Sequence, residues 1–364
     1  MGKALSGGTQ ILTPDGFVLM EDIQVGENVY DSNGKLTKVT FKTDVQYNRT
    51  CYKVKFIHGE EIIADADHEW MVIDKSGEEE LYTTEQLLHY KRINARHTSG
   101  IKINLAPAVP FDKKEVPIDP YTLGVWLGDG FSISNKITTH IDDYEEFSKL
   151  LMTEGMKFRK NSTTCFDFKL TDITCAMLKE NDLYKNKHIP KDYIFNDFNT
   201  RLELLRGLMD TDGSVEKNGV CRFYQSDLNM IKDVRLLLSS LGIKSTLKSK
   251  ETIGKMAYRL CFTTSDFDVF KLPRKLERQH INKQNIKNKR FYLDYIEQIE
   301  SEPVYCIEVD SETHMFLAGE TLIPTHNCTL GDTRITVRNK RTGEVMEIEM
   351  SELLDRVSDE TDNR

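Results

Sequence analysis

The sequence predicts an all-β unit that is interrupted by an α+β unit. Residues 4–110 and 296–327 contain short apolar-polar alternations such as CYKVKF and PVYCIEV, and turn signals such as PDG and SNG separate several of them. Residues 111–295 alternate helix-like stretches such as DYEEFSKLLMTEG with strand-like ones such as YRLCFTT. Because β character returns after this region, we expect one domain to be inserted into another.

Length and composition indicate a globular chain with more than one domain. The chain has 364 residues, 39% of them hydrophobic. No apolar run reaches the roughly eighteen residues that would indicate a membrane span, and the start of the chain lacks the apolar region of a secretory signal. The seven cysteines, an odd number without a CxxC pair, argue against a disulfide framework and a zinc site. We expect no membrane partner and a location in the cytoplasm of a bacterial or phage-infected cell.

Charge is distributed unevenly along the chain. The formal net charge of −9 argues against nucleic-acid binding, but residues 271–290 hold eight Lys or Arg against one Glu. A local basic stripe can bind phosphates on a chain that is acidic overall. The candidate DNA-binding residues in this stripe are Lys271, Arg274, Lys275, Arg278, Lys283, Lys287, Lys289 and Arg290.

Two segments of the α+β unit share a small, apolar helix pattern that ends in Asp-Gly. They are LGVWLGDG (123–130) and LRGLMDTDG (205–213). Small residues allow two helices to pack closely, which brings Asp129 and Asp212 near each other at the helix ends. Two carboxylates at such a junction can hold Mg²⁺ between the protein and scissile phosphates.

These paired segments resemble the motifs of LAGLIDADG homing endonucleases. The resemblance implies cleavage of both strands of DNA, with Asp129 and Asp212 binding the metal and β-strands lying in the major groove. It also implies lysines near the metal, for which Lys187 and Lys275 are candidates. Trp126 and Gly128 depart from the usual motif in the first segment. This departure leaves the implied metal-binding role unchanged and bears only on the expectation that the two helices pack closely.

The tripeptide His326-Asn327-Cys328 carries a chemistry of its own. The amide of Asn327 can attack the Asn327 carbonyl, which closes a cyclic imide and breaks the peptide bond. His326 can supply the proton that the leaving amine needs. Cys328 offers a thiol, which is a better nucleophile than a hydroxyl near neutral pH.

Further segments resemble the blocks of an intein splicing domain of the Hint fold. They are TQILTPDGFVLMEDIQVGENVYDSNGK (9–35), ADADHEWMV (64–72), PVYCIEV (303–309) and THMFLAGETLIPTHN (313–327). The resemblance implies a horseshoe-like, all-β splicing domain interrupted by an α+β endonuclease. It also places the splice junctions at Ala4 and Asn327.

The first position of the splicing domain falls on Ala4, which has no nucleophile. Ala4 is either an engineered block or the mark of a class 3 intein, a class that uses an internal Cys in the strand of YCIEV and a Trp two residues after the block-B His. Cys306 and Trp70 match both features. In a third route, Cys328 attacks the N-terminal junction directly. The sequence leaves the first nucleophile open between Cys306 and Cys328.

The histidines have implied roles in the same reading. His68 polarises or strains the scissile bond before Ala4, and His314 and His326 assist the cyclisation of Asn327. No cofactor is expected for splicing, whereas Mg²⁺ is expected for the endonuclease.

Residues 328–364 repeat the start of the chain. Cys328 aligns with Ala4, Gly331 with Gly7, Thr333 with Thr9 and Ile335 with Ile11, each followed by a Gly turn and an acidic-apolar return. One hypothesis is that a second intein, or its N-terminal fragment, starts at Cys328 and needs a complementary fragment. The alternative is an ordinary host segment.

The sequence thus predicts five segments: an N-terminal flank (1–3), two parts of a splicing domain (4–110 and 296–327), an inserted endonuclease (111–295) and a C-terminal flank (328–364). The predicted function is self-splicing of residues 4–327 with ligation of the flanks, plus site-specific cleavage of the intein-less host gene. The alternatives are a splicing-blocked precursor, a Hint domain that cleaves without ligating, and a DNA-binding regulator with an inactive nuclease.

Overall fold

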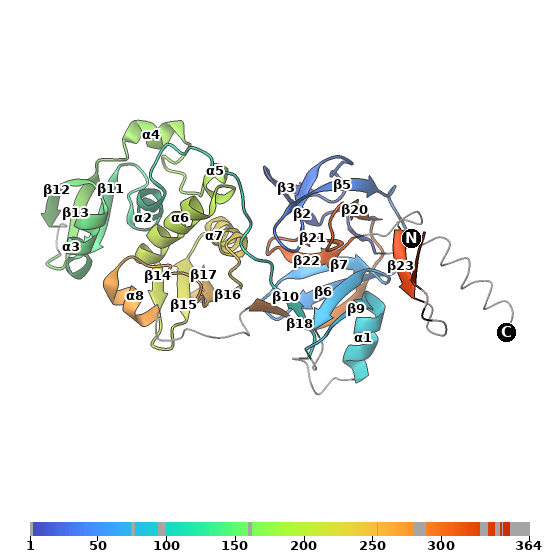
Figure 1. Cartoon of the computed structure of the whole chain (residues 1–364). Helices are drawn as coiled ribbons and strands as arrows, with labels where there is room; N and C mark the ends of the chain where they lie inside the picture. The colour runs from blue at the N-terminus through green and yellow to red at the C-terminus, as the bar shows by residue number, and fades with distance from the viewer. Residues whose placement is uncertain are drawn as a thin grey trace.

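The computed structural model consists of a β-rich body and a helix-containing body, which lie side by side (Figure 1). None of the described helices has the length and apolar composition needed to span a bilayer. The structure describes residues 3–73, 77–93, 100–158, 162–252, 254–279, 289–327, 334–338, 343 and 345–349.

The β body takes its strands from both sides of the insertion, which confirms the predicted all-β unit interrupted by an α+β unit. Its largest sheet has the order β19-β1-β7-β6-β18-β10-β8-β9, and smaller sheets β22-β21-β2-β3 and β20-β5-β4 lie beside it. Its elements are β1 (Leu5–Ser6), β2 (Gln10–Thr13), β3 (Gly16–Leu19), β4 (Asn28–Tyr30), β5 (Leu36–Lys42), β6 (Cys51–Phe56), β7 (Glu61–Asp65), β8 (Glu69–Ile73), β9 (Glu79–Thr83), α1 (Thr84–Ile93), β10 (Lys102–Asn104), β18 (Arg290–Ile299), β19 (Val304–Tyr305), β20 (Ile307–Val309), β21 (Met315–Ala318) and β22 (Ile323–His326).

The inserted body has two helices at its centre, α2 and α6, and two antiparallel sheets. The sheet β11-β13-β12 follows α2 in the chain, and the sheet β14-β15-β17-β16 follows α6. The elements are α2 (Pro120–Asp129), β11 (Lys136–His140), α3 (Ile141–Leu150), β12 (Thr153–Phe158), β13 (Cys165–Leu170), α4 (Cys175–Glu180), α5 (Lys191–Ile194), α6 (Phe198–Thr211), β14 (Gly213–Val215), β15 (Cys221–Gln225), α7 (Leu228–Ser240), β16 (Ser245–Thr252), β17 (Lys255–Phe262) and α8 (Pro273–Gln279).

One domain boundary from the sequence needs correction. The predicted boundary between residues 295 and 296 falls inside β18, which pairs with β6 and β10 of the β body. The alternation of RFYLDYIEQI makes one continuous strand, with Phe291 and Leu293 buried in the core of the β body. The β body therefore resumes at Arg290.

The segment before α2 packs on the inserted body. Buried Arg201 of α6 donates to the carbonyls of Val109 and Ser240, and its guanidinium lies 4.9 Å from the ring centroid of Phe111. A second tie joins the two bodies, because buried Arg235 of α7 donates to Glu60 of the β body at 2.8 Å. These contacts fix the inserted body against the β body.

Two glycines set the distance between α2 and α6. A Cβ on Gly207 would lie 2.2 Å from the Tyr121 carbonyl oxygen, and one on Gly124 would lie 2.4 Å from the Leu204 carbonyl oxygen. The helix backbones are therefore in direct contact. At each glycine, the absence of a side chain leaves room for the backbone of the facing helix. This contact is the close packing expected from the small residues of the two motifs.

We expect Gly207→Ala to separate α2 from α6 and destabilise the inserted body by at least about 3 kcal/mol, because backbone atoms cannot move aside as side chains do. The measurement is the Tm of the full chain, with an expected fall of about 10 °C. Gly8→Ala is the matched control, since a Cβ there meets only the Ser6 Oγ at 3.9 Å. Equal Tm values for the two variants would contradict the backbone contact.

Candidate splice junction and candidate nuclease site

Side chains form hydrogen bonds to both the carbonyl oxygen and the N–H of the peptide bond between Lys3 and Ala4. The Nδ1 of His68 lies 2.8 Å from the Lys3 carbonyl oxygen, and the Ala4 N–H donates to Asp65 Oδ1 at 3.1 Å. The fold holds this arrangement because β1, which follows Ala4, lies between β19 and β7, and because β7 ends at Asp65. Each polar atom of the predicted scissile bond is thus hydrogen-bonded to a side chain, the carbonyl oxygen to His68 and the N–H to Asp65.

The state of His68 follows from its two partners. A carbonyl can only accept, so Nδ1 carries the proton, and Nε2 accepts from the Thr325 hydroxyl. Burial lowers the pKa of His68 to about 3, so the ring is neutral near pH 7. His68 can therefore polarise the Lys3 carbonyl as a neutral donor.

Asp65 was missed by sequence reasoning. Its side chain is buried, and Arg49 donates to Oδ2 from Nη2 at 2.7 Å and from Nε at 3.1 Å. Burial raises the pKa of Asp65, while Arg49 opposes that shift. The paired guanidinium favours the charged carboxylate, which leaves Oδ1 for the Ala4 nitrogen. A carboxyl group three residues before His68 was the available signal.

Cys306 lies close to Ala4. Both residues belong to one buried cluster with Cys51 and Val304. Leu5 pairs with Tyr305 in the antiparallel sheet, and continuing this register by one residue places Ala4 opposite Cys306. Cys306 is disulfide-bonded, which the scattered, odd-numbered cysteines did not suggest. A thiol reductant must therefore release its sulfur before it can act as a nucleophile.

Trp70 supports His68 from the side. Its ring is fully buried and meets the imidazole edge to face with 4.9 Å between the ring centroids. Its Nε1 donates to the Thr84 hydroxyl at 3.0 Å, and the same hydroxyl donates to the His68 carbonyl. Trp70 therefore helps to fix the position of His68 and does not touch the scissile bond.

The C-terminal junction reaches the same region through β22. The Nδ1 of His326 lies 3.0 Å from the Asn327 carbonyl oxygen, the carbonyl that the Asn327 side chain would attack. The fully buried Asn327 is held by its Nδ2 donating to the Val309 carbonyl and by its backbone N–H donating to the His314 carbonyl. Burial lowers the pKa of His326. Cys328 lies outside the described residues.

His314 and Glu69 complete the surroundings of this junction. The rings of His314 and His326 are stacked with centroids 6.3 Å apart. Glu69 lies 3.0 Å from Lys3 Nζ and 3.8 Å from His326 Nδ1. One carboxylate thus bridges the two ends of the predicted splicing domain.

Asp129 and Asp212 mark the ends of α2 and α6. Burial, and then the charge of Asp212, raise the pKa of Asp129 to about 6. Burial also raises the pKa of Asp212, with Lys187 and Lys275 opposing the shift. A cavity of about 420 Å³ opens beside Asp129 and is lined in part by His140. Asp129 is exposed and Asp212 is half-buried, so a ligand from solvent can reach both. Two neighbouring carboxylates that repel each other are a donor set that fits a divalent cation.

The two lysines occupy equivalent positions at the helix ends. Lys187 Nζ donates to the Leu127 and Gly128 carbonyls at 3.0 and 3.1 Å, and buried Lys275 donates to the carbonyls of Asp210 and Gly213 at 2.7 and 2.6 Å. Burial lowers the pKa of each amino group to about 8, while nearby aspartates oppose the shift. Each lysine stabilises the end of a helix that carries an aspartate.

Several residues of the predicted basic stripe form ion pairs or hydrogen bonds within the chain. Lys271 pairs with Glu203, Arg274 makes two short bonds to Asp143, and Lys289 pairs with Asp266. Lys275 is buried and directed at helix carbonyls, so it does not contact a DNA backbone from this position. Arg278 is exposed, Arg290 lies at the start of β18, and Lys283 and Lys287 fall outside the described residues. Three of the eight candidate residues are thus paired with acidic side chains distant in sequence.

A basic face that sequence reasoning missed lies on the sheet after α6. The register places Tyr224 opposite Arg259, and Arg259 opposite Lys248. Arg222 lies two positions along β15 and pairs with Glu216 at 2.5 Å. The intervening Phe223 and Leu260 are buried on the other face. The period-two alternation of CRFYQ and YRLCF was the available signal.

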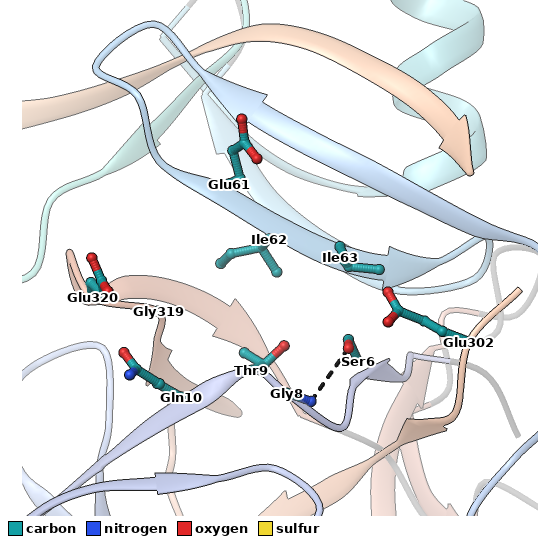
Figure 2. A pocket seen from close by; sticks show the side chains of 10 residues that line it. All are labelled: Ser6, Gly8, Thr9, Gln10, Glu61, Ile62, Ile63, Glu302, Gly319 and Glu320. Carbon is teal, nitrogen blue, oxygen red and sulfur yellow. Dashed lines mark hydrogen bonds between the residues drawn. The ribbon is translucent and has the colours of Figure 1, made fainter. Parts of the chain in front are cut away.

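The cavity in Figure 2 is separate from both sites. It has a volume of about 520 Å³ and lies between the start of the β body, β7 and the turn at Gly319. Three glutamates, Glu61, Glu302 and Glu320, are among the residues that line it (Figure 2). None of the junction residues described above lines it.

Comparison with known families identifies one domain directly. A family model described as a LAGLIDADG-like domain matches residues 199–293. The match begins in α6 and covers the sheet β14-β15-β17-β16, and therefore includes Asp212.

Two curated relatives are replicative DNA helicases. The chain is 30% identical over 382 aligned residues to DnaB of Mycobacterium intracellulare, covering 96% of this chain and 63% of that protein. It is 39% identical over 70 residues to DnaB of Mycobacterium leprae, covering 19% of this chain and 12% of that protein. The chain thus spans less than two thirds of the length of either relative.

Solved structures with some likeness fall into two groups. The crystal structure of the MchDnaB-1 intein gives a TM-score of 0.31 at 15% identity, covering 89% of this chain and 99% of that one. The homing endonuclease I-DmoI in complex with DNA and Ca gives 0.31 at 14% identity, covering 44% and 95%.

Two features, the divided β body with both junctions in one region and the matched domain inserted into it, agree with the sequence expectation. Residues 199–293 thus form a LAGLIDADG-like domain that is inserted into the divided β body.

Proposed function

We propose that residues 4–327 excise themselves and join their flanks, and that the inserted domain cuts double-stranded DNA. One observation carries the splicing proposal. Both polar atoms of the Lys3–Ala4 peptide bond, and the carbonyl oxygen of Asn327, are bound by side chains of one buried region.

In the first step, a thiol attacks the Lys3 carbonyl carbon. His68 donates to the carbonyl oxygen and stabilises its developing negative charge. The C–N bond to Ala4 breaks, a thioester forms, and the thiol proton passes to the Ala4 nitrogen. The Asp65 carboxylate, already bonded to that nitrogen, stabilises the positive charge of the leaving amine.

The buried cluster shared by Ala4 and Cys306 supports Cys306 as the first nucleophile. This route needs a thiol reductant, because the Cys306 sulfur is disulfide-bonded in the structure. The reducing cytoplasm supplies one. The acyl group then passes to Cys328; in the other route, Cys328 attacks the Lys3 carbonyl itself.

In the last steps, Asn327 Nδ2 attacks the Asn327 carbonyl carbon. His326 donates to the carbonyl oxygen. Asn327 Nδ2 gives up one proton as the imide closes, the bond to the Cys328 nitrogen breaks, and that nitrogen takes up a proton. The freed amine of Cys328 attacks the thioester, which gives an ordinary peptide bond between Lys3 and Cys328. His314 contributes by holding the Asn327 backbone and by stacking on His326.

For the inserted domain, we expect Asp129 and Asp212 to hold a divalent cation such as Mg²⁺. When bound, this cation supplies positive charge for an attacking water and a leaving oxygen on scissile phosphates. The basic face of Arg222, Lys248 and Arg259 contacts the DNA backbone. Lys187 and Lys275 position the two aspartates. The target is a host gene that lacks the insertion, and a replicative helicase gene is the first to test because both curated relatives are helicases.

For splicing, we expect the full chain, expressed with a folded reporter before Met1, to lose residues 4–327 under reducing conditions. The measurement is intact-mass spectrometry over time. We expect Asn327→Ala to block release at the C-terminal junction, and Cys306→Ala to lower the initial thioester yield at least tenfold.

Cys175→Ala is the matched control, because Cys175 is a free, exposed cysteine of α4. Normal splicing by Cys306→Ala, together with loss of the thioester in Cys328→Ala, assigns the first attack to Cys328. No excision by the unmodified chain with or without reductant contradicts the splicing proposal.

For the nuclease, we expect double-strand cleavage of a library of intein-less host-gene fragments with Mg²⁺ and none with a chelator. The double variant Asp129→Asn, Asp212→Asn should lose at least a thousandfold in rate, because both cation-binding carboxylates are gone. Gel analysis of cleavage products measures the rate. Asp172→Asn, after β13, is the matched control, and undiminished cutting by the double variant refutes the metal assignment.

A further inference from the structure

The segment after Asn327 repeats the first elements of the β body in strand spacing. Gln10, which opens β2, follows Ala4 by six positions, as Arg334 follows Cys328 where β23 (Arg334–Arg338) begins. β23 then pairs antiparallel with β24 (Val345–Glu349), as β2 pairs with β3.

The register of the two hairpins also agrees. In the first, Ile11 pairs with Val18. In the second, Ile335 pairs with Ile348. Both aligned isoleucines therefore occupy the second position of their strand and face a β-branched partner. The number of residues between the paired strands differs, with six between β23 and β24 and two between β2 and β3.

The sequence after each hairpin continues the match. In the β body, Met20 and Ile23 follow β3 and are fully buried, and the Met20 N–H donates to the Thr9 carbonyl at 2.8 Å. Met350 and Leu353 stand at the same distances beyond Ile348 as Met20 and Ile23 beyond Val18. Core-forming residue types thus recur where the first domain needs them.

The second hairpin lacks the strands that complete the first. β3 and β2 form a four-stranded sheet with β21 and β22, in which Ile11 pairs with Ala318. In the described part of the chain, the sheet that holds β23 and β24 has only those two strands. An isolated hairpin is marginally stable in water, so this segment has the character of one part of a larger fold.

We propose that Cys328 is also the first residue of a second splicing domain, which opens with residues 328–353. This inference rests on the proposed splicing of residues 4–327. Excision of those residues joins Lys3 to Cys328 and so creates the N-terminal junction of the second domain. The position that is Ala4 in the first domain is a thiol-bearing residue in the second.

This arrangement imposes an order on the two reactions. Before excision, the peptide bond preceding Cys328 belongs to Asn327. After ligation, Cys328 Sγ attacks the Lys3 carbonyl carbon, the Lys3–Cys328 C–N bond breaks, and the thiol proton moves to the Cys328 amine. The product is a thioester between Lys3 and Cys328. The product junction of the first splicing reaction is thus the substrate of the second.

The test grafts the second segment into the first domain. In the full chain with an N-terminal reporter, residues 4–19 are replaced by a copy of residues 328–349, so that the grafted Cys follows Lys3 and Met20 follows the graft. Cys306 and the original Cys328 are changed to Ala, which leaves the grafted thiol as the nucleophile at the junction. Hydroxylamine then releases the reporter wherever a thioester forms.

We expect at least tenfold more hydroxylamine-dependent release from the graft than from a graft of the same composition in scrambled order with Cys kept first. Changing the grafted Cys to Ala should abolish the release. Release no greater than that of the scrambled graft overturns the proposal, because a host segment would not supply the hairpin and core positions. Splicing of the ungrafted chain, assayed in parallel, tests the proposed function separately.

Discussion

The β body binds the two polar atoms of one peptide bond with opposite kinds of group. The Lys3 carbonyl receives a hydrogen bond from a neutral histidine, and the Ala4 N–H gives one to a carboxylate. These groups come from β7 and from the segment between β7 and β8, and β1 is held beside them by pairing with β7 and β19. This pair of hydrogen bonds therefore requires strands from both halves of the interrupted domain.

The same dependence explains how a large insertion is tolerated. β18 returns the chain directly into the main sheet between β6 and β10, so the insertion replaces a connection and leaves the sheet intact. Glu60 and Arg235 form a buried ion pair across the two bodies, with 4% and 6% of their surfaces exposed. Because removing one partner would leave a buried charge, this pair favours one docked arrangement over others.

Sequence reasoning reached the elements whose chemistry is local. The two Asp-Gly helices and His326-Asn327 are short patterns, and the direct contact of Gly124 and Gly207 with the facing helix agrees with them. Residues whose roles depend on partners distant in the sequence could not be predicted. Asp65 accepts a hydrogen bond from Ala4, Thr325 donates one to His68, and Lys271 forms an ion pair with Glu203. Spacing along the chain does not encode such pairings.

The most direct test of the hydrogen bonds to the scissile bond is the rate of thioester formation in Asp65→Asn. This rate is measured in an Asn327→Ala background by the release of an N-terminal reporter with hydroxylamine. Asp67→Asn is the matched control, since Asp67 also binds Arg49 at 2.7 Å but makes no hydrogen bond to Ala4 in the structure. We expect Asp65→Asn to slow release about a hundredfold, as loss of a charged group at a reacting atom does, and Asp67→Asn to change it little. Equal rates for the two variants would contradict a role for the Asp65 carboxylate in departure of the Ala4 amine.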